Sequence, residues 1–228
     1  MKRFIIGTLL AICFAMPTNV NAGSYGVPRG MGTLFAIRAA ERTSVNTELF
    51  GLKWGMSVDE VKRVTGSQLR ASTNVHGLKG YATDYIKNGL SDAETYVFAF
   101  YHDGLIKIAL ATKSFVSDPF GTAGKKRFEE LYKIAEDSGY TEVDIYRIFG
   151  TKLFDEPDEF YECMRYNGCG AWAAFMKKGD TSLLIKIEGE RRGVGYITLT
   201  IENSPLLEKV LDEEQKNRSS NDRKAFGN

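Results

Sequence analysis

The sequence is short of the residues that most often build catalytic and metal sites. It holds two histidines, three cysteines and two tryptophans among 228 residues. His76 lies beside a glycine and His102 in an expected turn, and neither has a second histidine at a metal-ligand spacing. The sequence also lacks a nucleophile elbow, a phosphate-binding loop and a dinucleotide fingerprint. We therefore predict no catalytic residue, no cofactor and no metal site.

A strong excess of either charge is absent too. The chain has 30 basic and 29 acidic residues. A nucleic-acid-binding protein would show a basic excess, so we predict no nucleic-acid partner. After the first 16 residues, no apolar run approaches the roughly 20 residues that a membrane-spanning helix needs. We therefore expect no transmembrane segment in the mature chain.

The N-terminus has the pattern of a secretory signal peptide. Lys2 and Arg3 precede an apolar run over residues 4–16, and a small-x-small ending closes at Ala22. We predict a signal peptide over 1–22, cleaved near Ala22, and hence a periplasmic or secreted protein. Loss of the two basic residues would leave 28 basic and 29 acidic residues, which is close to neutral.

The cysteines predict one structural bridge. Cys13 lies inside the apolar run behind the bulky Ile12, which argues against lipoprotein processing. Cys163 and Cys169 enclose a short segment with an Asn-Gly turn, and in an exported protein such a pair favours a disulfide. The alternative is a redox pair, but catalytic pairs usually have two intervening residues at a helix start, and here there are five.

Composition divides the rest of the chain into three parts. Residues 23–48 are Gly-rich at first and show no clear period, so we expect a flexible N-terminal arm. Residues 49–214 alternate apolar and polar patterns and predict one α+β domain, or two similar lobes. Residues 215–228 are polar and predict a disordered tail.

The domain opens with a clear helix signal. Ser57 and Glu60 form a capping box, valines then recur at a spacing of three, and Gly66 is placed to end the helix. Two turns of helix are too short to be stable alone, so this helix must pack on another element.

An aromatic hairpin follows. The strand "ETYVFAFY" alternates, an Asp-Gly turn lies at 102–104, and "LIKIAL" returns. An amphipathic pattern then predicts a helix over 124–138, and "TEVDIYRIF" predicts a further strand.

Three more strands form an antiparallel meander in this interpretation. A turn at 178–180 and a flexible loop at 189–195 join them, and Ser204 caps a last helix. The strands are "AWAAFMK", "SLLIKIE" and "YITLTIE". Adjacent strands with helices on one face indicate the α+β class: an antiparallel sheet made of a hairpin plus a three-stranded meander.

These fragments together resemble a known group of proteins. "GLKWGMSVDEVKRV" resembles the opening of small exported bacterial domains of the BamE-like and beta-lactamase-inhibitor-protein-like type, which place helices on a sheet. "YVFAFYHDGLIKIAL" is similar to their aromatic hairpin, and the helix with "LYKIAEDSGY" and the segments between 171 and 206 are similar to the later half of their pattern. The resemblance implies a non-catalytic role in protein binding or envelope assembly.

The hypothesis that follows is an exported protein that binds a protein or envelope component. Its predicted partner-binding residues are Arg191, Arg192 and Lys178; the sequence leaves the oligomeric state open. Two alternatives remain. One is a cell-wall or glycan hydrolase with paired carboxylates, whose separation in space a sequence does not reveal. The other is a small-ligand binder that uses the aromatic hairpin face, although we expect the helix over 124–138 to cover that face.

The acidic run between Asp155 and Glu162 also has two interpretations. It could bind calcium, but it lacks the alternation and central glycine of a calcium loop. A solvated, charged loop is the interpretation that its pattern favours.

Overall fold

The structure is a computed structural model that describes residues 49–72, 78–150 and 153–226. The predicted signal peptide over 1–22, the predicted arm over 23–48 and His76 lie outside the described residues.

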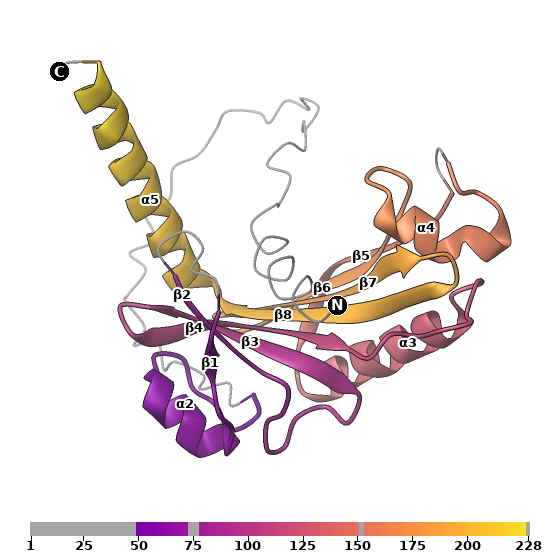
Figure 1. Cartoon of the computed structure of the whole chain (residues 1–228), viewed down its shortest axis with the longest axis horizontal. Coiled ribbons are helices and arrows are strands. Elements are labelled where there is room, and N and C mark those ends of the chain that lie inside the picture. Colours follow the sequence, from indigo (N-terminus) through magenta and orange to yellow (C-terminus); the bar gives the residue numbers. More distant parts are fainter. Residues whose placement is uncertain (1–48, 73–77, 151–152, 227–228) are drawn as a thin grey trace, which may run out of the picture.

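One antiparallel sheet of eight strands organises the molecule, in the order β1-β2-β3-β4-β8-β7-β6-β5 (Figure 1). Its strands are β1 (Arg70–Ala71), β2 (Lys79–Thr83), β3 (Ala93–Tyr101), β4 (Gly104–Thr112), β5 (Thr141–Ile148), β6 (Ala171–Lys178), β7 (Thr181–Arg191) and β8 (Val194–Asn203). The α+β class, the hairpin β3–β4 and the meander β6–β7–β8 are confirmed. The sheet is open, so β1 and β5 are its two edge strands.

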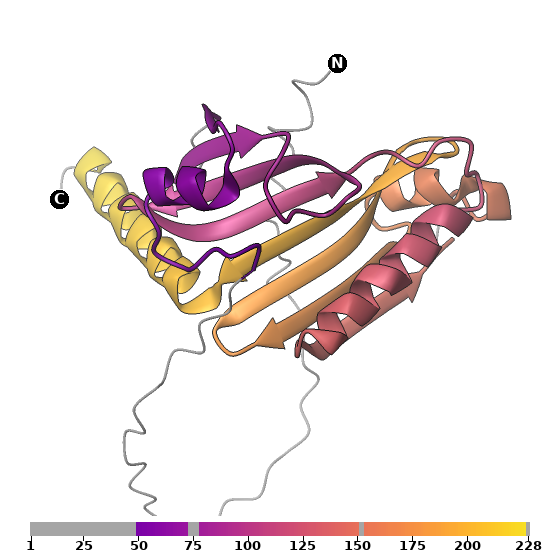
Figure 2. The same cartoon turned by 90° about the horizontal axis from the view of Figure 1, so that it is seen from below.

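Four α-helices pack against the sheet (Figures 1 and 2). They are α2 (Val58–Thr65), α3 (Thr122–Asp137), α4 (Phe160–Arg165) and α5 (Ser204–Ala225), and a short 3₁₀ helix, η1 (Pro157–Glu159), precedes α4. None of the helices in the described part of the chain combines the length and apolarity that a membrane span requires.

The local signals at the start of the domain are present as predicted. The Ser57 side chain accepts from the Glu60 N–H, and the Glu60 carboxylate accepts from the Ser57 N–H. Gly66 ends α2 in the left-handed conformation. The β3–β4 turn places His102 and Asp103 at φ 45° and 66°, as a two-residue type I′ turn requires.

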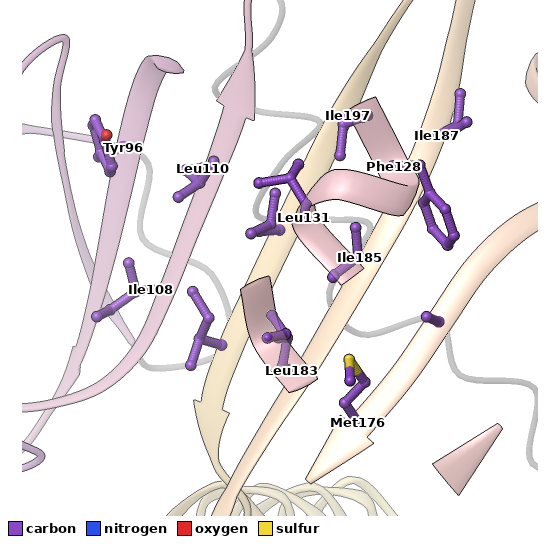
Figure 3. Packing of buried hydrophobic residues seen from close by; sticks show 14 of the residues in the cluster. Tyr96, Ile108, Leu110, Phe128, Leu131, Met176, Leu183, Ile185, Ile187 and Ile197 are labelled. Carbon is purple, nitrogen blue, oxygen red and sulfur yellow. The ribbon is translucent and has the colours of Figure 1, made fainter. Parts of the chain in front are cut away.

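The main core lies between the sheet and helices α2, α3 and α4. Figure 3 shows Phe128 and Leu131 of α3 beside Ile185 of β7 and Ile197 of β8. On the aromatic hairpin, Tyr96, Phe98 and Phe100 point into the same core and are buried. The small-ligand hypothesis needs that hairpin face to be accessible, and it is not.

A smaller core lies on the opposite face, under the start of α5, so the helices lie on both faces of the sheet and not on one as predicted. Leu206 and Val210 pack there against Leu78, Ala99 and Ile106. Alternation along β3 explains the two cores, because neighbouring residues of a strand point to opposite faces. The helix begins one residue after Asn203, whose side chain accepts from the Leu206 N–H, so the cap is Asn203 and not Ser204.

Helix α5 is longer than the sequence predicts. It continues to Ala225 and projects past the edge of the sheet (Figures 1 and 2), so residues 215–225 of the predicted disordered tail over 215–228 are helical. Residues 215–224 hold no apolar residue, but they include Gln, Lys and Arg, which are good helix formers.

The predicted flexible loop over 189–195 is wrong. Strand β7 runs to Arg191 and β8 starts at Val194, so Arg192 and Gly193 alone form the turn. Gly189 and Gly195 face each other across the ladder. These glycines serve packing, described below, and not flexibility.

Candidate functional site

The three cationic residues predicted to bind a partner do not form one surface. Arg191 and Arg192 lie at one end of β7, and Lys178 lies just before its other end. An 11-residue strand spans about 35 Å. Arg192 pairs with Asp158, Arg191 lies 3.0 Å from a carboxylate oxygen of Glu190, and Lys178 donates to the Ser138 carbonyl.

The predicted disulfide is present. Cys163 in α4 is joined to Cys169, with their Cα atoms 5.1 Å apart. The bridge closes the chain between α4 and the start of β6 at Ala171. The first two residues of the same helix, Phe160 and Tyr161, are buried in the core.

Tyr161 occupies a socket made by three glycines. A Cβ built on Gly189 would lie 1.8 Å from the carbonyl oxygen of Tyr161. A Cβ on Gly195 would lie 2.1 Å from the Tyr161 ring, and one on Gly124 would lie 2.3 Å from the Tyr161 hydroxyl. Any side chain at these positions would overlap the tyrosine. The glycines at 189 and 195 thus make room for α4 on the sheet.

Asp118 links this socket to α3. Its carboxylate accepts from the N–H groups of Thr122, Ala123 and Gly124, and also from the Tyr161 hydroxyl at 2.9 Å. Gly121, at the N-cap position, has no side chain to cap the helix, so Asp118 takes that role. Burial, with the hydrogen bond to Asp118, holds the pKa of Tyr161 far above its usual range.

The acidic run begins at the surface with Asp155 and Glu156 and ends inside α4, where one carboxylate oxygen of Glu162 is buried without a hydrogen-bond partner among the described residues. Asp158 in η1 pairs with Arg192 across the β7–β8 turn. Among the described residues, no three His, Cys, Asp or Glu side chains gather as metal ligands would. The ion pair between Asp158 and Arg192 therefore holds this segment against the β7–β8 turn.

Two hollows stand out along the described residues, and neither brings carboxylates together in a cleft. One follows α5 and contains Asp212 as its single acid; the other is a small apolar gap beside Trp54 and Leu105. The hydrolase hypothesis gains no support from either.

Exposed apolar side chains gather instead at the β5 edge. Val143, Tyr146 and Ile148 are 60%, 36% and 43% exposed. Alternation and the pairing of Tyr146 with Ala173 place Tyr146 and Ile148 on the face opposite α3, where the Tyr146 ring packs edge-on against Phe175. A single strand rarely leaves so much apolar surface in water without a use.

The end of β5 lies beside the disulfide loop. Gly170, next to Cys169, lies against the Ile148 carbonyl, and the Leu153 carbonyl lies beside the Cys169 sulfur. Leu153 and Tyr166 are also exposed, at 51% and 47%. We call the set Val143, Tyr146, Ile148, Leu153 and Tyr166 the edge strip.

The α3 side of β5 is polar. The Arg147 guanidinium holds the Glu129 carboxylate through two hydrogen bonds of 3.0 and 2.9 Å. Tyr132 donates to Glu142 at 2.6 Å, and this bond is the main cause that raises the pKa of Tyr132 to about 12. The free edge thus has one side with Tyr146 and Ile148, on which Asp144 is the charged residue of β5, and a second side that is acidic and hydrogen-bonded.

Sequence reasoning found β5 as a strand but did not identify it as a site. Its sequence, "TEVDIYRI", shows apolar residues without a covering partner, which is a weak signal. Comparison of the chain with protein-family models, with curated protein sequences and with solved structures gives no match. The resemblance to BamE-like and beta-lactamase-inhibitor-protein-like domains therefore stays a prediction.

Proposed function

We propose that the protein is an exported, non-catalytic binding protein that holds a protein or cell-envelope component at its β5 edge. The observation that carries this proposal is the edge strip: three exposed apolar side chains on the last long strand of an open sheet, and two beside the disulfide, Leu153 before α4 and Tyr166 after it. Exposed apolar surfaces with polar residues around them are typical of protein interaction sites.

Two features support the exported setting. The signal-peptide pattern predicts export, and the disulfide between Cys163 and Cys169 is the kind of bridge that persists in an oxidising compartment. Cell fractionation, with mass spectrometry of the mature N-terminus, tests this part. A chain that begins at Gly23 and collects outside the cytosol is expected; an unprocessed cytosolic chain would contradict it.

Site-specific crosslinking tests the surface. A photoreactive amino acid replaces Tyr146 in the full chain, and a matched probe replaces Val116, which is 65% exposed in the loop between β4 and α3. We expect one abundant adduct at the first site and background at the second. The substitution Ile148→Ser, beside the probe, should weaken the adduct. Equal labelling at the two sites would remove the proposal.

A further inference from the structure

We infer that β5 accepts an extended segment of the partner as a ninth strand, and that this segment alternates apolar and basic residues. The inference rests on the proposed function and names the mode of binding. Strand addition gains affinity from main-chain hydrogen bonds and specificity from alternate side chains. Three features of β5 support strand addition: the backbone of the free edge, its side chains and Asp144.

The free edge of β5 offers backbone groups at alternate residues. The Ile145 N–H donates to the Asp144 carboxylate at 2.9 Å, so this N–H points away from β6. In an antiparallel pair, residues alternate between those bonded to the neighbour and those facing outward. Arg147, two residues on, therefore also presents its N–H and carbonyl outward. No described strand lies beyond β5 to take these groups.

The side chains predict the composition of the added segment. Residues directly opposite in a sheet share a face, so one side of the segment would lie beside Tyr146 and Ile148, which are apolar and exposed. Its other side would lie beside Glu142 and the Arg147–Glu129 pair, where the two carboxylates outnumber the single guanidinium. Alternating apolar and basic residues satisfy both sides.

Asp144 restrains the edge in the free protein. Its carboxylate occupies the Ile145 N–H and accepts from the Tyr146 hydroxyl, and β5 has a bulge between Glu142 and Asp144. Charged side chains and bulges are the devices that keep edge strands from pairing without control. An incoming strand must displace this carboxylate to reach Ile145.

The experiment uses the full mature chain and a capped octapeptide of alternating valine and lysine, with binding measured by fluorescence anisotropy. In the inferred register, the lysine N–H groups donate to β5 and the valine N–H groups face away. N-methylation of the lysine amides should therefore abolish binding, and N-methylation of the valine amides should spare it. Equal effects of the two modifications, or no binding by the parent peptide, would overturn the inference.

Variants of the protein supply the second measurement. Arg147→Pro removes an outward N–H, which an edge strand tolerates, while Arg147→Ala keeps the N–H and loses the same guanidinium. We expect Arg147→Pro to bind the peptide about tenfold more weakly than Arg147→Ala, the effect of one lost hydrogen bond. Asp144→Ala should bind several-fold more tightly than the natural protein. Equal affinities of the two Arg147 variants would contradict strand addition.

The outcomes separate this inference from the proposed function. If the adduct at position 146 persists in the Arg147→Pro protein, the edge strip binds a partner without strand addition, and only the inference fails. If the natural chain alone forms a dimer that Arg147→Pro dissolves, the occupant is a second copy, and the inferred partner is wrong. Sedimentation of the chain without peptide measures this.

Discussion

The hydroxyl of Tyr161 lies 2.9 Å from the carboxylate of Asp118, which stands 43 positions earlier in the chain and also caps α3. One carboxylate thus ties the disulfide-bonded helix α4, the first turn of α3 and the loop after β4 to each other. Substitutions of Asp118 and of Tyr161 should therefore change the free energy of unfolding by different amounts.

Asp118→Ala should destabilise the protein more than Tyr161→Phe does. The first change leaves three helix N–H groups and a buried hydroxyl without their acceptor, and we expect a loss of about 2–3 kcal/mol in the free energy of unfolding. The second change removes one hydrogen bond and should cost about 1 kcal/mol. Urea unfolding measures both, and equal costs would show that Asp118 does not cap α3.

Gly124→Ala tests the glycine socket. In the natural chain its Cβ would lie 2.3 Å from the Tyr161 hydroxyl, so we expect destabilisation of about 1–3 kcal/mol. In a Tyr161→Phe background the nearest ring carbon is 3.3 Å away, and the higher helix propensity of alanine should make the same change neutral or stabilising by up to about 1 kcal/mol. A double-mutant cycle measures this change of sign. Identical effects in both backgrounds would argue against the socket.

Lys107 and Glu202 form a buried ion pair across β4 and β8, at 2.9 Å. Lys107→Met alone leaves a buried carboxylate without its cation, and we expect a loss of about 3–5 kcal/mol. Lys107→Met combined with Glu202→Leu removes both charges and should cost less than the single change. Chemical denaturation measures the free energy of unfolding of both variants. A double variant less stable than Lys107→Met alone would contradict this prediction.

Tyr140 should make stability fall at alkaline pH. Burial raises its pKa to about 12, and its hydroxyl has no hydrogen-bond partner among the described residues. Because an unfolded tyrosine has a pKa of about 10, the folded state holds the proton more tightly, and its contribution is complete below pH ~10 and lost between pH ~10 and ~12.

Tyr140→Phe should therefore flatten the decline of stability over that range and leave stability at pH 7 unchanged or slightly higher, since the unpaired hydroxyl is removed. Urea unfolding at a series of pH values measures the slope, with Tyr85→Phe at an exposed site as the control. A slope unchanged by Tyr140→Phe would contradict the assignment.

The elements that the sequence predicts well are those whose signals are local. Ser57 and Glu60 are three positions apart, and the turn at His102 and Asp103 needs only its own two residues and Gly104. Strand alternation likewise depends on neighbours along the chain. These features fix secondary structure before any tertiary contact is considered.

The errors come from contacts between distant segments. Gly189 and Gly195 resemble loop residues until Tyr161 is placed over them. The edge strip was missed for the same reason. That β5 lies at the margin follows from β4 pairing with β8, a contact between residues about 90 positions apart, and no local pattern reports it.

The sheet is unequal at its two margins. At one end β1 consists of two residues, and at the other β5 consists of eight. A molecule with one long edge strand can pair with one further strand, but it has no second long edge strand at which the sheet could be extended. Complexes formed at β5 should therefore saturate at one guest per molecule and never extend into fibres.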